Sequence, residues 1–285
     1  MGMENMKKLL KKAEIGKYAV GAFTTFNMEY TRAILEVAEE LRSPVIIMIG
    51  TVEAEYAGME RLSSLIQHEV EKYSIPVALH FDHGNTFEIV MQAIRCGFTS
   101  VMFDGSLLPY EDNVAVTRDI VRIAHAVGVD VEGEIGLIGG QEGEIQSTVD
   151  LGSHLTDPEE ARDFAQKTGV DALAVAIGTS HGIYRTQPNI DIERLKAIRN
   201  ILPIPLVLHG GSDTPEEKIR ESIKNGIVKI NINSDLKAAF TKGLREYLSH
   251  NPEDISFEKA ISHSLIQMKN ILRHKFHLLG SAGKA

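Results

Sequence analysis

The feature that most constrains how this chain folds is an alternation, repeated eight times, of short apolar runs with amphipathic stretches. The apolar runs are rich in Val and Ile, which is typical of parallel strands that are buried on both faces of a sheet. We expect strands at 18–23, 44–49, 76–80, 99–103, 129–134, 171–176, 205–208 and 226–230. The stretches between them space apolar residues at helical intervals. They predict helices at 29–42, 58–72, 86–95, 111–127, 191–199 and 234–249, with two more beginning near Pro158 and Thr214.

Strand–helix units in such a succession indicate a (β/α)8 TIM barrel rather than an open doubly wound sheet. Residues 3–14 and 256–279 show helical patterns outside these units. We therefore expect a short helix before the barrel and an extra helical segment at the C-terminal end. The 285 residues contain no linker and no shift in composition, so we expect one α/β domain over residues 1–285.

The charge and the cysteine content argue against several classes of protein. The chain has 30 Lys and Arg against 39 Asp and Glu, and this net charge of −9 disfavours a surface for nucleic acid or anionic membrane. Cys96 is the only cysteine, which excludes internal disulfides and favours the cytoplasm. No apolar run approaches the roughly 20 residues that span a bilayer, and the N-terminal segment lacks the apolar core of a signal peptide. We expect a cytoplasmic protein without membrane or nucleic-acid partners.

Three histidines stand apart because each follows a predicted strand and precedes a glycine. Among the 11 histidines of the chain, only His83, His181 and His209 have a glycine after them. A single histidine at such a place is more often a satisfied core or surface residue, but three at the carboxyl ends of barrel strands are expected to share one site. Three neutral imidazoles bind Zn2+ and leave a coordination position open, as in a Lewis-acid site.

Carboxylates also end the predicted strands near these histidines. Asp82 precedes His83, and its carboxylate either orients an imidazole or serves as a general acid/base toward the substrate, which is the role we favour. Asp104 and Glu134 either cap helices and fill a barrel layer, or they hold the metal in a second position. Glu132 points to the same face of its strand as Glu134 and is interpreted as structural.

Two kinds of glycine-rich segment complete the predicted rim. Residues 136–153 form a long glycine-rich stretch, which we interpret as a lid that brings Glu142 to the substrate rather than as a plain loop. A phosphate site is expected after the seventh and eighth strands, where backbone N–H groups and a helix N-terminus favour an anion. Its predicted residues are Gly210, Gly211, Ser212, Asn231, Asn233 and Ser234.

These motifs, in this order along the chain, resemble those of the class II, zinc-dependent fructose-/tagatose-bisphosphate aldolase family. They span 77–84, 131–142, 174–182, 206–212 and 229–234, so the resemblance covers essentially the whole chain. It implies a lyase of carbohydrate metabolism, in glycolysis, that reversibly cleaves a ketose 1,6-bisphosphate of the tagatose or fructose type. The products would be dihydroxyacetone phosphate and an aldehyde such as glyceraldehyde 3-phosphate.

The resemblance implies a metal site as well. His83, His181 and His209 would hold the catalytic Zn2+, and Asp104 and Glu134 would form the second metal position. Another divalent metal would be able to replace zinc, and a monovalent cation would assist.

The resemblance also implies how the substrate is handled. Asp82 would exchange the proton of the C4 hydroxyl, and Glu142 the proton at the carbon of dihydroxyacetone phosphate. Gly182, together with the phosphate-site residues named above, would bind this ketone and its phosphate. The partners implied are the phosphorylated sugar and further copies of the chain, in a homodimer or homotetramer.

The chain departs from the family's pattern at three positions in these motifs. Thr24 stands where an Asn is usual, Asp213 replaces a Gly after the Gly-Gly-Ser turn, and Ser234 replaces a Thr. Arg273 and Lys275 are the candidates to bind the second phosphate of the substrate.

Several alternatives to a zinc aldolase of simple ketose bisphosphates remain open. One is an aldolase that acts on a modified ketose phosphate. Another is a Schiff-base aldolase, which needs a desolvated lysine inside the barrel. Lys229 is the one strand-end candidate, and we expect it to support the phosphate site instead. The others are a metal-dependent hydrolase and a non-catalytic sugar-phosphate-binding protein on the same fold.

Overall fold

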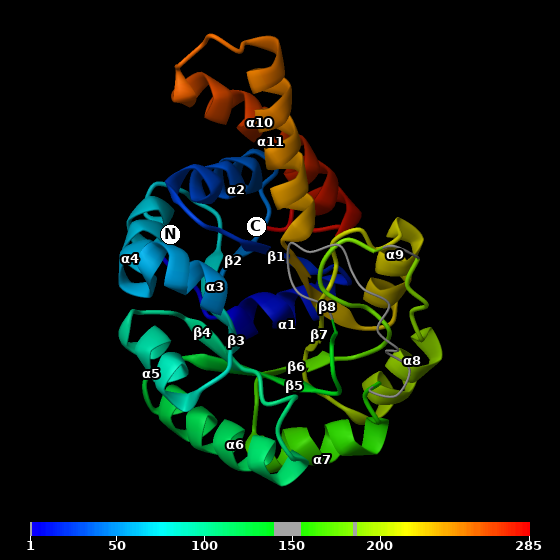
Figure 1. The fold of residues 1–285 in the computed structure, drawn as a ribbon. Helices are drawn as coiled ribbons and strands as arrows, with labels where there is room; N and C mark the ends of the chain where they lie inside the picture. Colours follow the sequence, from blue (N-terminus) through cyan, green and yellow to red (C-terminus); the bar gives the residue numbers. More distant parts are fainter. Residues whose placement is uncertain (1, 140–154, 185–186) are drawn as a thin grey trace.

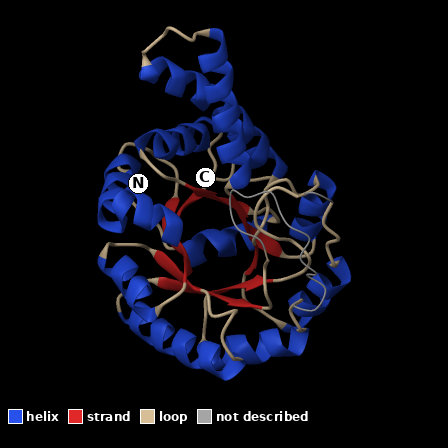
Figure 2. Ribbon diagram, in the orientation of Figure 1, coloured by secondary structure: helices blue, strands red, loops and turns tan. Residues whose placement is uncertain are grey.

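Parallel strands close into a barrel in the order β1-β2-β3-β4-β5-β6-β7-β8, and β1 pairs with β8. The computed structural model describes residues 2–139, 155–184 and 187–285 of the chain. The strands are β1 Val20–Thr24, β2 Val45–Gly50, β3 Val77–Gly84, β4 Ser100–Phe103, β5 Asp130–Ile135, β6 Ala172–Val175, β7 Leu206–Leu208 and β8 Ile227–Ile232. Figure 2 shows them as an inner ring surrounded by helices, which confirms the predicted TIM barrel.

Helices connect the strands on the outside of the barrel (Figure 1). They are α2 Met28–Glu40, α4 Met59–Val70, α5 Phe87–Arg95, α6 Tyr110–Ala126, α7 Pro158–Thr168, α8 Ile192–Ile201, α9 Glu216–Lys224 and α10 Ser234–His250. Helix α7 begins as the sequence predicts, because Asp157 accepts hydrogen bonds from the N–H groups of Glu159 and Glu160. The structure adds two short elements that the sequence did not indicate, α3 Thr51–Glu53 and the π-helical turn η1 Ala54–Gly58, which lead from β2 into α4.

Helix α1, Met6–Gly16, closes one end of the barrel and lies behind the ring of strands in Figure 1. Its buried side chains join a cluster with strand residues of the barrel interior; they are Met6, Leu9, Leu10 and Ala13. Burying a Leu or Met side chain contributes about 1.5–3 kcal/mol. With this end filled, polar groups are left to gather at the other end, where the strands have their carboxyl termini.

This packing predicts that Leu10→Ala destabilises the fold by about 2–5 kcal/mol, because the substitution leaves a cavity beneath the barrel. Leu10 has 0% exposed surface, whereas Ile15 on the same helix is 84% exposed and serves as the matched control. Ile15→Ala is expected to change the free energy of unfolding by less than about 0.5 kcal/mol. Urea denaturation measures both variants, and equal losses would contradict the role assigned to α1.

The C-terminal part of the chain forms the predicted extra helical segment. Helix α11, Phe257–Leu278, packs against α10 and then against α2, and the α10–α11 hairpin projects from the barrel in Figure 1. The ring of Phe276 lies 5.0 Å from that of Phe23 on β1, which anchors the end of α11 to the barrel. None of the described helices is long and apolar enough to cross a membrane.

Candidate active site

The carboxyl end of β3 is irregular, and this irregularity turns His83 toward the barrel mouth. The register between β3 and β4 shifts between Phe81 and Gly84, so that β3 contains an extra residue. His83 lies in this bulge with a left-handed φ of 49°, a conformation that bulky residues adopt only where their surroundings enforce it. A bulge takes side chains out of the regular alternation of a strand, so consecutive residues Asp82 and His83 both reach the same site.

Three imidazole rings converge at the barrel mouth. The ring centroid of His83 lies 4.8 Å from that of His181 and 4.7 Å from that of His209, and the latter two are 5.7 Å apart. One ring nitrogen of each lies within 4.8 Å of the others. His83 Nε2 and His209 Nδ1 are buried and have no hydrogen-bond partner among the described residues. Buried polar atoms without a partner are rare, and this donor set fits a divalent metal ion.

Carboxylates fix the orientation of two of these rings. His83 Nδ1 donates a hydrogen bond to Asp104 Oδ2 at 2.8 Å, and Asp104 Oδ1 is held by the N–H and the hydroxyl of Ser106 at 3.1 and 2.6 Å. His209 Nε2 donates to Glu132 Oε1 at 3.0 Å. Each ring therefore uses one nitrogen on a carboxylate and turns the other toward the cluster, the usual arrangement of metal-binding histidines.

Glu134 on β5 adds a carboxylate to the same cluster. Its Oε2 lies 3.4 Å from His209 Nδ1, and its carboxylate belongs with His83 and Asp104 to a second group whose ligand atoms lie within 4.8 Å of one another. Burial, together with the negative charge of Asp104, raises the pKa of Glu134 well above its usual value. A bound cation reverses such a shift, so these residues form a second set of donors beside the imidazoles.

Asp82 lies next to the imidazoles and is held by an amide. Asn231 Nδ2 donates hydrogen bonds to both carboxylate oxygens of Asp82 at 3.1 Å, and His83 Nε2 is 3.8 Å from Asp82 Oδ2. Burial raises the pKa of Asp82, but the charge of His83 outweighs it, and the pKa lies well below its usual value. The carboxylate is therefore anionic at neutral pH, as a general base requires. The sequence predicts a substrate contact for Asn231, and the structure places its side-chain amide on Asp82.

The glycine turn after β7 meets the start of α10, as the phosphate-site prediction requires. The N–H of Gly211 donates to the carbonyl of Asn231 at 3.0 Å. Ser212 Oγ accepts hydrogen bonds from the N–H groups of Asn233 and Asp235 at 3.1 and 3.3 Å. An oxygen atom is thus already accommodated at the N-terminus of α10, where the helix dipole favours an anion.

Close contact between two loops explains the glycines of this turn. Gly210 has a φ of 67°, and a Cβ atom there would lie 2.3 Å from the carbonyl oxygen of Ser180. Gly182, with a φ of 99°, belongs to the same loop as Ser180, and Ser234 is the buried first residue of α10. The structure therefore brings together all the predicted phosphate-site residues at one rim of the barrel.

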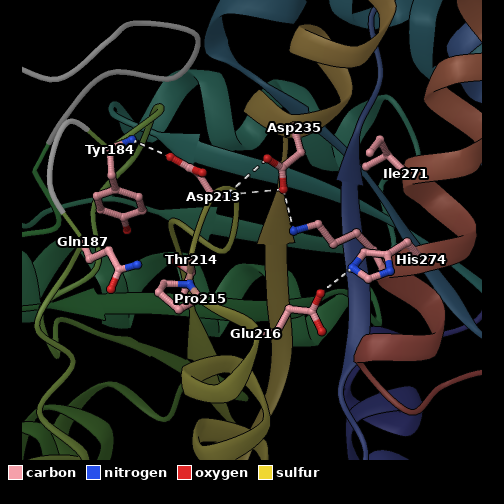
Figure 3. A pocket seen from close by; sticks show the side chains of 10 residues that line it. Tyr184, Gln187, Asp213, Thr214, Pro215, Glu216, Asp235, Ile271 and His274 are labelled. Atoms are coloured by element: carbon pink, nitrogen blue, oxygen red, sulfur yellow. Dashed lines mark hydrogen bonds and ion pairs between the residues drawn. The ribbon is translucent and has the colours of Figure 1, made fainter.

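Asp213, the residue that replaces a glycine after this turn, has a left-handed φ of 54°. Its carboxylate accepts the N–H of Tyr184 at 3.0 Å, and its own N–H donates to the carboxylate of Asp235 at 3.1 and 3.3 Å (Figure 3). Asp235 is in turn paired with Lys275 at 2.5 Å. These residues line a pocket of about 500 Å3. The negative charge of Asp213 is therefore engaged by the Tyr184 amide.

The two basic candidates for the second phosphate are both engaged in ion pairs. The guanidinium of Arg273 contacts the carboxylate of Glu40 on α2 at 2.8 to 3.2 Å. Lys275 is held by Asp235, as described above. Their side chains therefore serve to attach α11 to its neighbours in this structure.

Of two other residues that the sequence singles out, the structure describes Thr24 but not Glu142. Thr24 is buried at the end of β1, and its Oγ1 has no hydrogen-bond partner among the described residues. Glu142 and residues 140–153 of the predicted lid lie outside the described residues.

Comparison with known proteins gives the family. A family model described as "Fructose-bisphosphate aldolase class-II" matches residues 4–284. The chain belongs to the class II fructose-bisphosphate aldolase family. The fructose-bisphosphate aldolase of Geobacillus stearothermophilus is 42% identical over 288 residues, covering 100% of this chain and 99% of that protein. The one from Thermus caldophilus is 42% identical over 301 residues, covering 98% of each.

Solved structures agree with this membership. The YdjI aldolase from Escherichia coli K12 superposes with a TM-score of 0.88 at 33% identity, over 99% of both chains. A putative fructose-1,6-bisphosphate aldolase from Coccidioides immitis gives a TM-score of 0.89 at 31% identity, over 98% of this chain and 97% of the other. The protein is thus an enzyme, a lyase of carbohydrate metabolism, and its family acts on phosphorylated sugars. This decides against the hydrolase and the non-catalytic alternatives.

The sequence pattern does not reveal the role of a buried pair inside the barrel of this aldolase. Lys229 Nζ lies 2.8 Å from Glu132 Oε2, and both side chains have 0% exposed surface. Burial raises the pKa of Glu132, but the charge of Lys229 lowers it to about 2. The lysine is thus paired and inaccessible, which disfavours the Schiff-base alternative. The sequence does contain an indication of this pair. Lys229 and Asn231 are two positions apart on one strand, so both side chains point to the interior of the barrel.

The charges around His83 predict that metal affinity rises with pH. Burial lowers the pKa of His83, but the charges of Asp82 and Asp104 raise it well above its usual value, so the metal-free imidazole carries a proton at pH 7. A metal ion has to displace this proton, so its apparent affinity increases by about tenfold per pH unit below that pKa. Calorimetric titration with Zn2+ in buffers of different ionisation enthalpy measures the proton released.

The variant Asp104→Asn tests the cause of this pH dependence, because it removes one of the charges that raise the pKa of His83. The variant is expected to release fewer protons at pH 7. A Zn2+ affinity of the unmodified chain that does not change between pH 6 and pH 8 would contradict the prediction.

Proposed function

We propose that this aldolase depends on a divalent metal ion, Zn2+ in the first place, and cleaves fructose 1,6-bisphosphate to dihydroxyacetone phosphate and glyceraldehyde 3-phosphate. The observation that carries the proposal is the pair of buried, unpartnered nitrogens, His83 Nε2 and His209 Nδ1, facing one another beside the Asp82 carboxylate. The relatives that are 42% identical are named fructose-bisphosphate aldolase, which supports the choice of sugar.

In this proposal His83, His181 and His209 hold the ion. Neutral imidazoles are good ligands for Zn2+, and other divalent ions bind the same ligands with different affinity. When bound, the ion supplies Lewis-acid polarisation of the ketose carbonyl. Glu134 and Asp104 are proposed as the second metal position, which requires Asp104 to release its hydrogen bond to His83 Nδ1.

Asp82 is proposed as the general acid/base of the reaction. In cleavage its anionic carboxylate takes the proton of the C4 hydroxyl as the bond between C3 and C4 breaks, and in condensation it returns that proton. The amide of Asn231 keeps the carboxylate in place through its two hydrogen bonds. Glu142 is proposed to move the proton at the carbon of dihydroxyacetone phosphate.

The phosphate of the ketone half is proposed to bind at the glycine turn and the start of α10. In this structure the N–H groups of Asn233 and Asp235 donate hydrogen bonds to Ser212 Oγ. With substrate bound, they would donate to an oxygen of that phosphate. Gly182 and Gly210 leave room for the substrate because neither carries a side chain. The remaining residues proposed to contact this half are Gly211, Asn231 and Ser234.

One observation favours a second candidate substrate. Arg273 and Lys275 are paired with Glu40 and Asp235, so a phosphate at the far end of a ketose bisphosphate would have to compete with these carboxylates. The second candidate is therefore a ketose phosphate whose aldehyde half is modified. Tagatose 1,6-bisphosphate, which differs from the fructose compound only at C4, is the third sugar to compare.

The decisive experiment combines a chelator with an Asp82 variant. Removal of the metal is expected to abolish cleavage, Zn2+ is expected to restore it, and borohydride with substrate is expected to have no effect. Asp82→Asn is expected to lower kcat by about 10²- to 10⁴-fold while Zn2+ binding is retained. A coupled assay of glyceraldehyde 3-phosphate measures the cleavage.

The matched control is Asp119→Asn, which changes an exposed carboxylate on α6 and is expected to leave kcat unchanged. Full activity after complete metal removal, or in Asp82→Asn, would refute the proposal. Relative kcat/KM values for fructose, tagatose and modified ketose phosphates decide among the sugars.

Self-association is proposed through the α10–α11 hairpin, which would give a homodimer or homotetramer. The tip of this hairpin carries large apolar side chains that are exposed in the single chain, among them Ile255 at 96% and Phe257 at 74%. Such a patch on a projecting element (Figure 1) is typical of a protein–protein interface.

This interface predicts that the double variant Ile255→Asp and Phe257→Asp is monomeric, because charges would be buried between copies. Light scattering after gel filtration measures the mass of the species. Val127→Asp changes a residue that is 61% exposed elsewhere on the molecule, and it is expected to leave the mass unchanged. An oligomer that survives the double substitution would refute this interface.

A further inference from the structure

A fully buried group of titratable side chains lies inside the barrel, adjacent to the imidazole cluster. Glu132 of β5, Lys229 of β8 and His80 of β3 each have 0% exposed side-chain surface. Removing a charge from water is costly, and well-packed apolar residues often stabilise a core as well as a buried ion pair does. Because a substrate has no access to these side chains, their purpose has to lie in the groups they contact.

Glu132 connects Lys229 to His209. Lys229 Nζ lies 2.8 Å from Oε2 and 3.1 Å from Oε1 of Glu132, so the ammonium group bridges both oxygens of the carboxylate. Oε1 also accepts the hydrogen bond from His209 Nε2 at 3.0 Å. Hydrogen bonds between charged groups are strong and directional, so Lys229 fixes the rotation of the carboxylate about its own axis. The carboxylate in turn fixes the plane of the imidazole.

The opposite nitrogen of His209 is the one that faces the cluster. Nδ1 is buried without a hydrogen-bond partner in the part of the chain that the structure describes, 3.4 Å from Glu134 Oε2. A neutral imidazole has one N–H, and the group that accepts it decides which nitrogen is left to bind a metal. Without a fixed acceptor at Nε2, the ring would be free to rotate and to present the wrong atom.

His83 provides a comparison within the same site. Its acceptor, Asp104, is fixed by the N–H and the hydroxyl of Ser106 at 3.1 and 2.6 Å, which are neutral donors near the surface. Glu132, by contrast, is held on the side away from His209 by the ammonium group of a lysine that comes from the far side of the barrel, 97 positions along the chain. Lys229 thus holds the carboxylate of Glu132 in place, as Ser106 holds that of Asp104.

We infer that Lys229 and Glu132 are positioning residues of the metal site, an inference that rests on the proposed function. Lys229 holds the Glu132 carboxylate, Glu132 holds the Nε2–H of His209, and Nδ1 of His209 is thereby kept facing His83 and His181. Neither residue touches substrate or the ion. Their effect is expected on metal affinity and on the geometry of coordination.

The test is a double-mutant cycle on metal affinity, with Zn2+ and Co2+ measured by competition against a chromophoric chelator. Lys229→Met is expected to weaken binding about 10- to 100-fold, the usual loss when a partner of a metal-binding histidine is removed. Glu132→Gln keeps an oxygen for the His209 N–H but loses the charge that Lys229 holds, so it is expected to weaken binding by a similar factor. Adding Lys229→Met to Glu132→Gln is therefore expected to cost much less than it does alone, since the two residues act as a unit.

The absorption spectrum of bound Co2+ reports the geometry of coordination, which a general loss of stability would not change. In Lys229→Met the visible bands of bound Co2+ are expected to shift, because His209 no longer binds in a fixed orientation. The matched control is Lys7→Met, which removes the ammonium group 2.7 Å from the buried carboxylate of Asp171 at the other end of the barrel. This control is expected to keep the metal affinity and the Co2+ spectrum of the unmodified chain.

His209→Ala separates failure of this inference from failure of the metal centre. If the unmodified chain binds no ion, or His209→Ala binds it equally well, the proposed metal centre is wrong and the inference falls with it. If His209→Ala loses the ion while Lys229→Met keeps its affinity and spectrum, the positioning role is wrong and the metal centre stands. Equal losses from Lys229→Met in both backgrounds would also overturn the inference. Should Lys229→Met not fold, wild-type affinity and an unchanged Co2+ spectrum in Glu132→Gln would overturn it.

Discussion

The close approach of three imidazole rings at one point of the barrel mouth is the constraint on which the rest of the site depends. Ring nitrogens of His83, His181 and His209 lie within 4.8 Å of one another. Rings this close present lone pairs to a common point only if their N–H groups are bound elsewhere, and the carboxylates of Asp104 and Glu132 accept two of them. The free energy needed to bury those carboxylates is offset in part by these same hydrogen bonds.

The barrel holds this arrangement because each contributing strand is fixed by two neighbours. Helix α1 fills one end with apolar side chains, so the polar groups share the opposite rim. Asp82 receives its amide partner, Asn231, from a strand across the interior, 149 positions further along the chain. Asp82, His83, His209 and the glycine turn after β7 thus lie at strand ends or directly after them, which keeps their distances nearly constant, whereas His181 lies on the loop between β6 and α8.

The sequence predicts the barrel and the shared rim well, since strand and helix periods are local properties and the carboxyl ends of parallel strands necessarily meet. It does not predict the bulge that turns His83 inward, because a register shift depends on the partner strand. The pairing of Lys229 with Glu132 depends on closure of the barrel, which no local pattern encodes. The sequence makes Arg273 a candidate for binding phosphate, but its guanidinium binds Glu40, because α11 folds back along α2.

The most direct test of the metal centre is anomalous X-ray diffraction at the zinc edge from crystals of the chain grown with Zn2+. We expect one strong anomalous peak within coordination distance, roughly 2.0–2.1 Å, of His83 Nε2, His209 Nδ1 and a ring nitrogen of His181. A peak at another place, or coordination through His209 Nε2 with Glu132 displaced, would contradict the account.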